Sequence, residues 1–189
     1  MIYLALGVAL WAGAHLATTL RLGFRDALIA KLDANKYKGL FSLAMLTAIG
    51  LIVVGWQNTA SLHVYDPPFW NSPVMILLMW IALFLFVAAR APNNVKRFIR
   101  HPQLTGVLVW AGAHLLANGD NRSLILFGGL GLWALLEILL INRREGAWTK
   151  PDAVPLTRDL IVAAISAALV VVLMLLHPYF AGMPIQFGS

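Results

Sequence analysis

The chain has 189 residues, of which 60% are hydrophobic and 12% are charged, with a formal net charge of +6 at pH 7. A soluble domain of this length needs more polar surface around its core, so the composition excludes ordinary soluble classes and predicts an all-α, polytopic protein in a lipid bilayer. The basic residues lie in short segments between apolar runs, which argues against a nucleic-acid partner, and the lack of cysteine excludes disulfides and thiolate metal sites.

Six apolar stretches follow in chain order, and each predicts one transmembrane helix of about 17–25 residues. They cover residues 2–20, 39–56, 73–89, 104–118, 123–141 and 160–177. The first has no Lys or Arg before it, so we expect a retained helix and not a cleavable signal peptide. The fourth is the shortest and requires a helix that begins near His101 or Pro102. Residues 22–32 mix apolar and basic side chains and predict a short interfacial helix.

The Lys and Arg residues are distributed unevenly between the loops. Thirteen of the fourteen lie in the segments 21–38, 90–103 and 142–159, which alternate with segments that are almost free of basic residues. Because positive charge is retained on the cytoplasmic side of membranes, we expect these three loops to be cytoplasmic and both termini to lie on the opposite side.

A short segment of the chain occurs twice. Residues 7–16 read GVALWAGAHL and residues 106–115 read GVLVWAGAHL, with eight of ten positions identical. The first and fourth predicted helices cross in opposite directions, so the chain 1–189 is predicted to form one domain of two inverted three-helix repeats, about 1–90 and 100–189. A chance match among small apolar residues is the alternative, but the shared Trp and His argue against it.

Each copy of the segment carries a Gly, a Trp and a His that share one helix face at intervals of four residues. These residues are Gly7, Trp11 and His15 in the first copy and Gly106, Trp110 and His114 in the second. Helical side chains lean toward the N-terminus, which directs both imidazoles toward the membrane midplane, and imidazole is a common ligand of haem iron. The Trp offers an apolar wall and the Gly admits a flat ligand. Hydrogen bonding of each His to a neighbouring helix and zinc binding are the alternatives.

Further polar residues lie near the cytoplasmic ends of the predicted helices. Cations there can bind haem propionates, although ordinary membrane topology also explains them; they are Arg21, Arg100 and His101. Glu137 is a carboxylate within the fifth apolar run, and we expect it to reach the surface or to pair with Arg143 or Arg144.

The stretch RHPQLTGVLVWAGAHLLANGD at 100–120 resembles the signature of the NnrU family, and His15 with YKGLFSL at 37–43 is similar to the family's N-terminal half. Bacterial members are associated with denitrification and nitric oxide metabolism. The family includes 15-cis-zeta-carotene isomerase, a haem b membrane protein that isomerises a carotenoid double bond through a redox-controlled change of axial ligand. The resemblance implies that His15 and His114 are haem ligands and that His101 is another family histidine. The isomerase has a Cys three residues before the second His, where this chain has Ala111.

The residues and the resemblance together predict a multi-pass protein of the bacterial inner membrane, with periplasmic termini, that binds the iron of haem b. It would be a redox-switched isomerase of a hydrophobic polyene, or a haem protein linked to denitrification or nitric oxide. A non-catalytic haem or nitric oxide sensor, an assembly factor, and a small transporter with inverted repeats are the alternatives. No residue is assigned a catalytic role.

Overall fold

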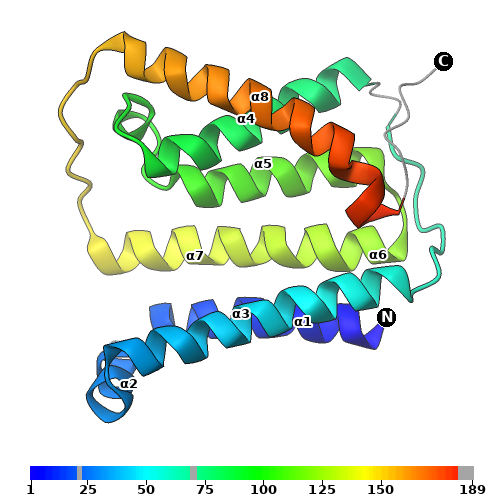
Figure 1. The fold of residues 1–189 in the computed structure, drawn as a ribbon, viewed down its shortest axis with the longest axis horizontal. Helices are drawn as coiled ribbons and strands as arrows, with labels where there is room; N and C mark the ends of the chain where they lie inside the picture. The colour runs from blue at the N-terminus through cyan, green and yellow to red at the C-terminus, as the bar shows by residue number, and fades with distance from the viewer. Residues whose placement is uncertain (21–22, 69–71, 183–189) are drawn as a thin grey trace.

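The computed structural model describes residues 1–20, 23–68 and 72–182, and the regular elements within these ranges are helices (Figure 1). The long helices are α1 (Ile2–Leu20), α3 (Ala34–Gln57), α4 (Ser72–Arg90), α5 (Pro102–Ala117), α7 (Gly129–Glu145) and α8 (Leu156–Ala181). The short ones are α2 (Phe24–Leu32), the 3-10 helix η1 (Val95–Arg97), α6 (Asn121–Ser123) and the π-helix η2 (Leu124–Gly128). The elements α6, η2 and α7 follow one another without a gap. The predicted all-α fold is confirmed.

Five helical segments are long and apolar enough to cross a membrane; they are Ile2–Leu20, Ala34–Gln57, Pro73–Arg90, Asn121–Glu145 and Leu156–Ala181. Large apolar side chains on these helices are exposed, as lipid-facing residues must be: Leu46 is 66% exposed and Leu175 is 70% exposed. The fourth predicted segment forms α5, whose 16 residues rise roughly 24 Å against a hydrocarbon core of about 30 Å. The chain is therefore a multi-pass membrane bundle, and the count of six crossings stays a prediction.

Local sequence signals define several helix ends. Pro102 is the first residue of α5, as expected for the shortest segment. Asp33 caps α3 by accepting hydrogen bonds from the N–H groups of Asn35 and Lys36. The interfacial helix predicted at 22–32 forms α2, which has no buried residue.

The helices lie in layers, with α5 and α7 in the middle, α1 and α3 on one side, and α4 and α8 on the other (Figure 1). Glycines bring the central helix α7 close to both copies of the duplicated segment. A Cβ at Gly129 would lie 2.6 Å from Val8 Cγ1 of α1, and a Cβ at Gly131 would lie 3.2 Å from Ala111 Cβ of α5. Helix α7 thus packs against both copies of the duplicated segment, and the division of the chain into two inverted repeats stays a prediction.

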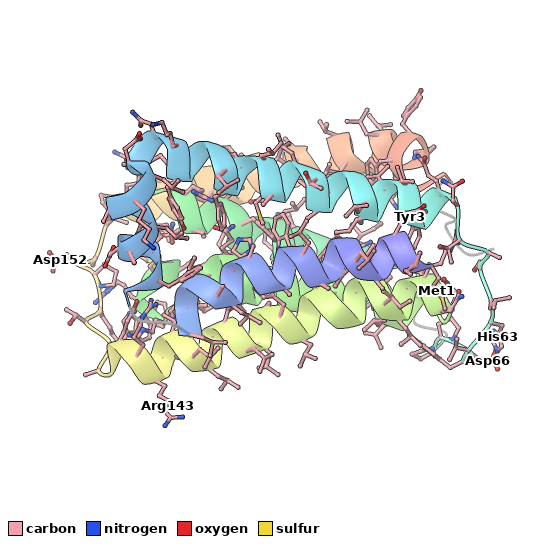
Figure 2. All side chains as sticks on the ribbon, turned by 90° about the horizontal axis from the view of Figure 1, so that it is seen from below. Met1, Tyr3, His63, Asp66, Arg143 and Asp152 are labelled. Carbon is pink, nitrogen blue, oxygen red and sulfur yellow. The ribbon has the colours of Figure 1, made fainter. Side chains whose placement is uncertain are left out.

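The connecting segments gather at the two ends of the bundle. At one end, Arg100 binds Glu145, and Asn94 binds Asp159 and the carbonyl of Val154. We call this the basic end, because the segments 91–101 and 146–155 and helix α2 lie there. At the opposite end, the 58–68 segment meets the turn before α6. Figure 2 shows Met1, His63 and Asp66 at that end and Arg143 and Asp152 at the basic end. The placement of the basic end in the cytoplasm stays a prediction.

Candidate functional site

The two histidines of the duplicated segment have the same local geometry. Nδ1 of His15 lies 2.8 Å from the carbonyl oxygen of Trp11, and Nδ1 of His114 lies 2.8 Å from that of Trp110. A carbonyl only accepts hydrogen bonds, so Nδ1 of each neutral ring carries the proton and Nε2 keeps its lone pair. Both rings are held against the helix backbone by these Nδ1 contacts. Metal-binding histidines are commonly oriented in this way, with one nitrogen held and the other available.

The surroundings of the two imidazoles differ. The ring centroid of His15 lies 4.9 Å from Trp11, 5.3 Å from Phe41 and 4.9 Å from Trp133. We call these four residues the His15 cluster. Its rings come from α1, α3 and α7, so three helices enclose this histidine.

His114 has its own aromatic neighbours. Its ring stacks on Phe127 of η2 at 4.3 Å with an interplanar angle of 21°, and it lies 5.2 Å from Trp110. We call these three residues the His114 cluster. Phe127 and Trp133 stand six residues apart on one continuous helix, which corresponds to roughly 9 Å of rise. The two histidines therefore contact different rings of this continuous helix, whereas Trp11 and Trp110 both pack against one core cluster that includes Trp133.

The His15 cluster contains an orphaned donor. The indole Nε1 of Trp11 is buried and has no hydrogen-bond partner among the described residues. The Trp11 and Trp133 rings form a T-shaped pair with centroids 5.8 Å apart. An unpaired buried N–H costs about 1–3 kcal/mol, and an acceptor on a bound molecule would recover this cost.

Glu137 is buried in α7 beside the His15 cluster. Its side chain is 4% exposed and accepts hydrogen bonds from Thr19 Oγ1 at 2.7 Å and Trp133 Nε1 at 3.4 Å. The expectation that it reaches the surface or pairs with Arg143 or Arg144 is wrong. Arg144 lies two turns further along α7, roughly 10 Å away, and pairs with Glu145, whereas Arg143 points out of the bundle (Figure 2). The spacing of Glu137 four residues after Trp133 was the signal that could have placed it.

The two glycines of the duplicated segment lie at close helix contacts. A Cβ at Gly7 would lie 2.8 Å from the carbonyl oxygen of Ala48 in α3, and one at Gly106 would lie 2.9 Å from that of Ala82 in α4. Neighbouring backbone therefore fills the space where a flat ligand was expected to approach. The reason is that these glycines allow close packing, which is the usual use of small residues between membrane helices.

Two of the three cations expected to bind propionates are brought together at the basic end. Arg100 donates to Glu145 at 3.1 Å and to the carbonyl of Gly146 at 2.8 Å. Nε2 of His101 lies 3.0 Å from Asn142 Oδ1. Arg21 lies outside the described residues. Within the described ranges, no three His, Cys, Asp or Glu side chains gather closely enough to hold a metal ion.

A comparison with protein-family models matches the model described as NnrU protein over residues 3–185. No curated protein and no solved structure matches the chain. The match spans nearly the whole sequence, including both copies of the duplicated segment and the helices between them. The chain therefore belongs to the NnrU protein family.

Proposed function

We propose that this membrane protein binds haem b, with His15 and His114 as the candidate iron ligands. The observation that carries the proposal is the pair of 2.8 Å contacts between Nδ1 and the carbonyl oxygen four residues earlier. This contact leaves an Nε2 lone pair on each ring. Bound haem would supply a redox-active iron, and the chain would supply imidazole nitrogens and aromatic contacts.

The chemistry of the surrounding residues fits this group better than it fits a bare metal ion. Aromatic rings line both histidines, and haem needs only axial ligands and apolar contacts. The orphaned N–H of Trp11 offers a donor within the His15 cluster. Zinc, by contrast, requires about four protein ligands when its role is structural. The role of Arg100 and His101 toward the propionates stays a prediction.

The proposal leaves two arrangements, in which the iron is bound by both histidines or by one of them. Two imidazoles can bind one metal only when their Nε2 atoms lie within about 4 Å of each other, since each metal–nitrogen bond is about 2 Å. His15 and His114 contact different aromatic rings, so joint ligation requires both Nε2 atoms to face one point between these rings. Either histidine alone would also offer an Nε2 lone pair to the group.

The test is the absorption spectrum of the full chain purified from haem-supplied cells, oxidised and then reduced. We expect bound haem in the wild type and at least about tenfold less haem, or a change from low-spin to high-spin iron, in His15→Ala and His114→Ala. His63→Ala is the matched control, because the His63 side chain is 68% exposed and lies at the end of the bundle opposite the basic end. A colourless wild type, or two Ala variants with the wild-type spectrum, would contradict the proposal.

The activity that such a haem would serve stays a prediction. Conversion of a cis-polyene by the reduced protein, and not by the oxidised protein, would support the isomerase. A spectral shift with nitric oxide and no turnover would support the sensor. Ala111, which stands where the family isomerase has a Cys, is 2% exposed and faces Gly131 of α7. At this position the chain therefore has a methyl group that packs against α7 in place of the isomerase's thiol.

A further inference from the structure

The basic end contains a pocket that the proposed haem ligands do not use. It has a volume of about 380 Å³ and opens between the segment around η1, the first turn of α5 and the segment after α7. Its polar lining comes from Lys96, Arg100, His101 and Gln103. A second pocket adjoins it and shares Arg100, His101 and Trp148.

The charge of the first pocket is positive. None of its lining residues is acidic, and Lys96 has no ion-pair partner among the described residues. Arg100 binds Glu145, which lines the adjoining pocket and neutralises part of the charge there. The turn that carries Lys96 also contains Arg97, whose buried Nε has no hydrogen-bond partner in the described structure. The pocket is thus a cationic recess suited to an anion.

The remaining wall of the pocket is apolar. Trp148, Pro102 and Leu104 contribute to it, and Lys150 lies 5.6 Å from the Trp148 ring. Trp side chains are enriched where membrane meets water, and basic residues there attract anionic lipids. The pocket thus combines an apolar wall with the two cations Lys96 and Arg100 at the end of a membrane bundle. This combination fits an amphiphile with an anionic headgroup.

We propose that this pocket binds the headgroup of an anionic phospholipid. The phosphate lies between Lys96 and Arg100, and the glycerol and upper acyl carbons lie against Trp148 and Pro102. Charge-assisted hydrogen bonds hold the phosphate, and the apolar wall selects a lipid over a free anion. The proposed iron ligands His15 and His114 do not line this pocket, and Lys96 and Trp148 have no predicted role toward haem, whereas Arg100 is also a predicted propionate contact.

The test is native mass spectrometry of the full chain released from mixed micelles of phosphatidylglycerol and phosphatidylcholine. The wild type should retain phosphatidylglycerol in preference to phosphatidylcholine. Lys96→Gln should lower the retention of phosphatidylglycerol about tenfold, because it removes one charge-assisted hydrogen bond. Lys96→Arg should restore it. Lys36→Gln is the matched control, because Lys36 lies at the same end with a side chain that is 77% exposed. Arg100→Gln should act like Lys96→Gln, with an unchanged melting temperature as its folding control.

Four outcomes would overturn the proposal. Equal retention of the two lipids would exclude selectivity for an anionic head. Equal loss of phosphatidylglycerol in Lys96→Gln and Lys36→Gln would place the lipid elsewhere. Inorganic phosphate that binds the wild type and not Lys96→Gln, without lipid preference, would assign the pocket to a soluble anion. Haem content measured on the same samples should stay unchanged in Lys96→Gln, and a parallel loss of haem and lipid would assign this pocket to propionates.

Discussion

Thr19 Oγ1 donates a hydrogen bond of 2.7 Å to Glu137 Oε2, so a residue near the basic end of α1 is bonded to a carboxyl group buried within α7. The other oxygen of Glu137 accepts from Trp133, whose ring packs against His15. Ionisable residues buried between membrane helices are costly and are functional candidates for that reason. Glu137 therefore fixes the position of Trp133 beside the proposed ligand His15.

Glu137→Ala should lower the free energy of unfolding by about 1–3 kcal/mol, because Thr19 and Trp133 would each lose an acceptor. Glu137→Gln should cost less, since its amide oxygen still accepts one of the two hydrogen bonds. Unfolding of the full chain in detergent measures both variants, with the exposed Asp152→Asn as control. A Glu137→Ala variant as stable as the wild type would show that the two hydrogen bonds contribute nothing.

The duplicated segment contains an internal comparison of glycines. Gly7→Ala and Gly106→Ala should each destabilise the protein by about 1–3 kcal/mol, because a Cβ at either position would meet backbone of a neighbouring helix within 3 Å. Gly13→Ala and Gly112→Ala should be neutral or stabilising by up to about 1 kcal/mol, because nothing lies within 4 Å of a Cβ there. Melting temperatures of the four variants should fall into these two pairs. A loss of stability in the second pair equal to that in the first would refute the close-contact assignment.

Much of the fold could be predicted from the sequence, because a bilayer forces long apolar helices. The first apolar stretch matches α1 within its bounds, and Pro102 begins α5. The charge distribution also predicted which loops share an end, and the contacts of Arg100 with Glu145 and Asn94 with Asp159 agree with it. The length of α5 is the exception, because hydropathy does not show that this helix packs in the middle of the bundle between α4 and α7.

The candidate site was predictable only where it is local. The spacing of four residues between Trp and His places Nδ1 at the preceding carbonyl in both copies, and a helix alone sets this geometry. The neighbours Trp133 and Phe127 come from a distant helix, so their pairing with His15 and His114 depends on tertiary packing. The burial of Glu137 depends on the same packing, and the sequence signal for it was its spacing of four residues after Trp133, not its place in an apolar run.

Asp120 should make the folded protein less stable as the pH falls into the acid range. Burial raises the pKa of this carboxyl, but the hydrogen bonds from Ser123 and the nearby Arg122 outweigh burial and hold the pKa below its ordinary value. The carboxylate therefore stabilises the folded state above the unfolded pKa of about 3.9, and this contribution is lost as pH falls through the lower folded pKa. Asp120→Asn should reduce the loss of melting temperature on acidification below about pH 4. An unchanged acid profile in this variant would exclude Asp120 as the cause.

Trp11 offers a test that separates stability from ligand binding. Trp11→Phe and Trp110→Phe both shrink an aromatic ring beside a histidine, but only the first removes an orphaned buried N–H. Trp11→Phe should therefore cost less stability than Trp110→Phe in haem-free protein, by about 1–3 kcal/mol. If a bound molecule accepts the Trp11 N–H, haem content should fall more in Trp11→Phe than in Trp110→Phe. Unfolding of the haem-free protein measures the stability, and the absorption spectrum measures the haem content. A Trp11→Phe variant that is less stable than Trp110→Phe and binds as much haem would show that this N–H faces no ligand.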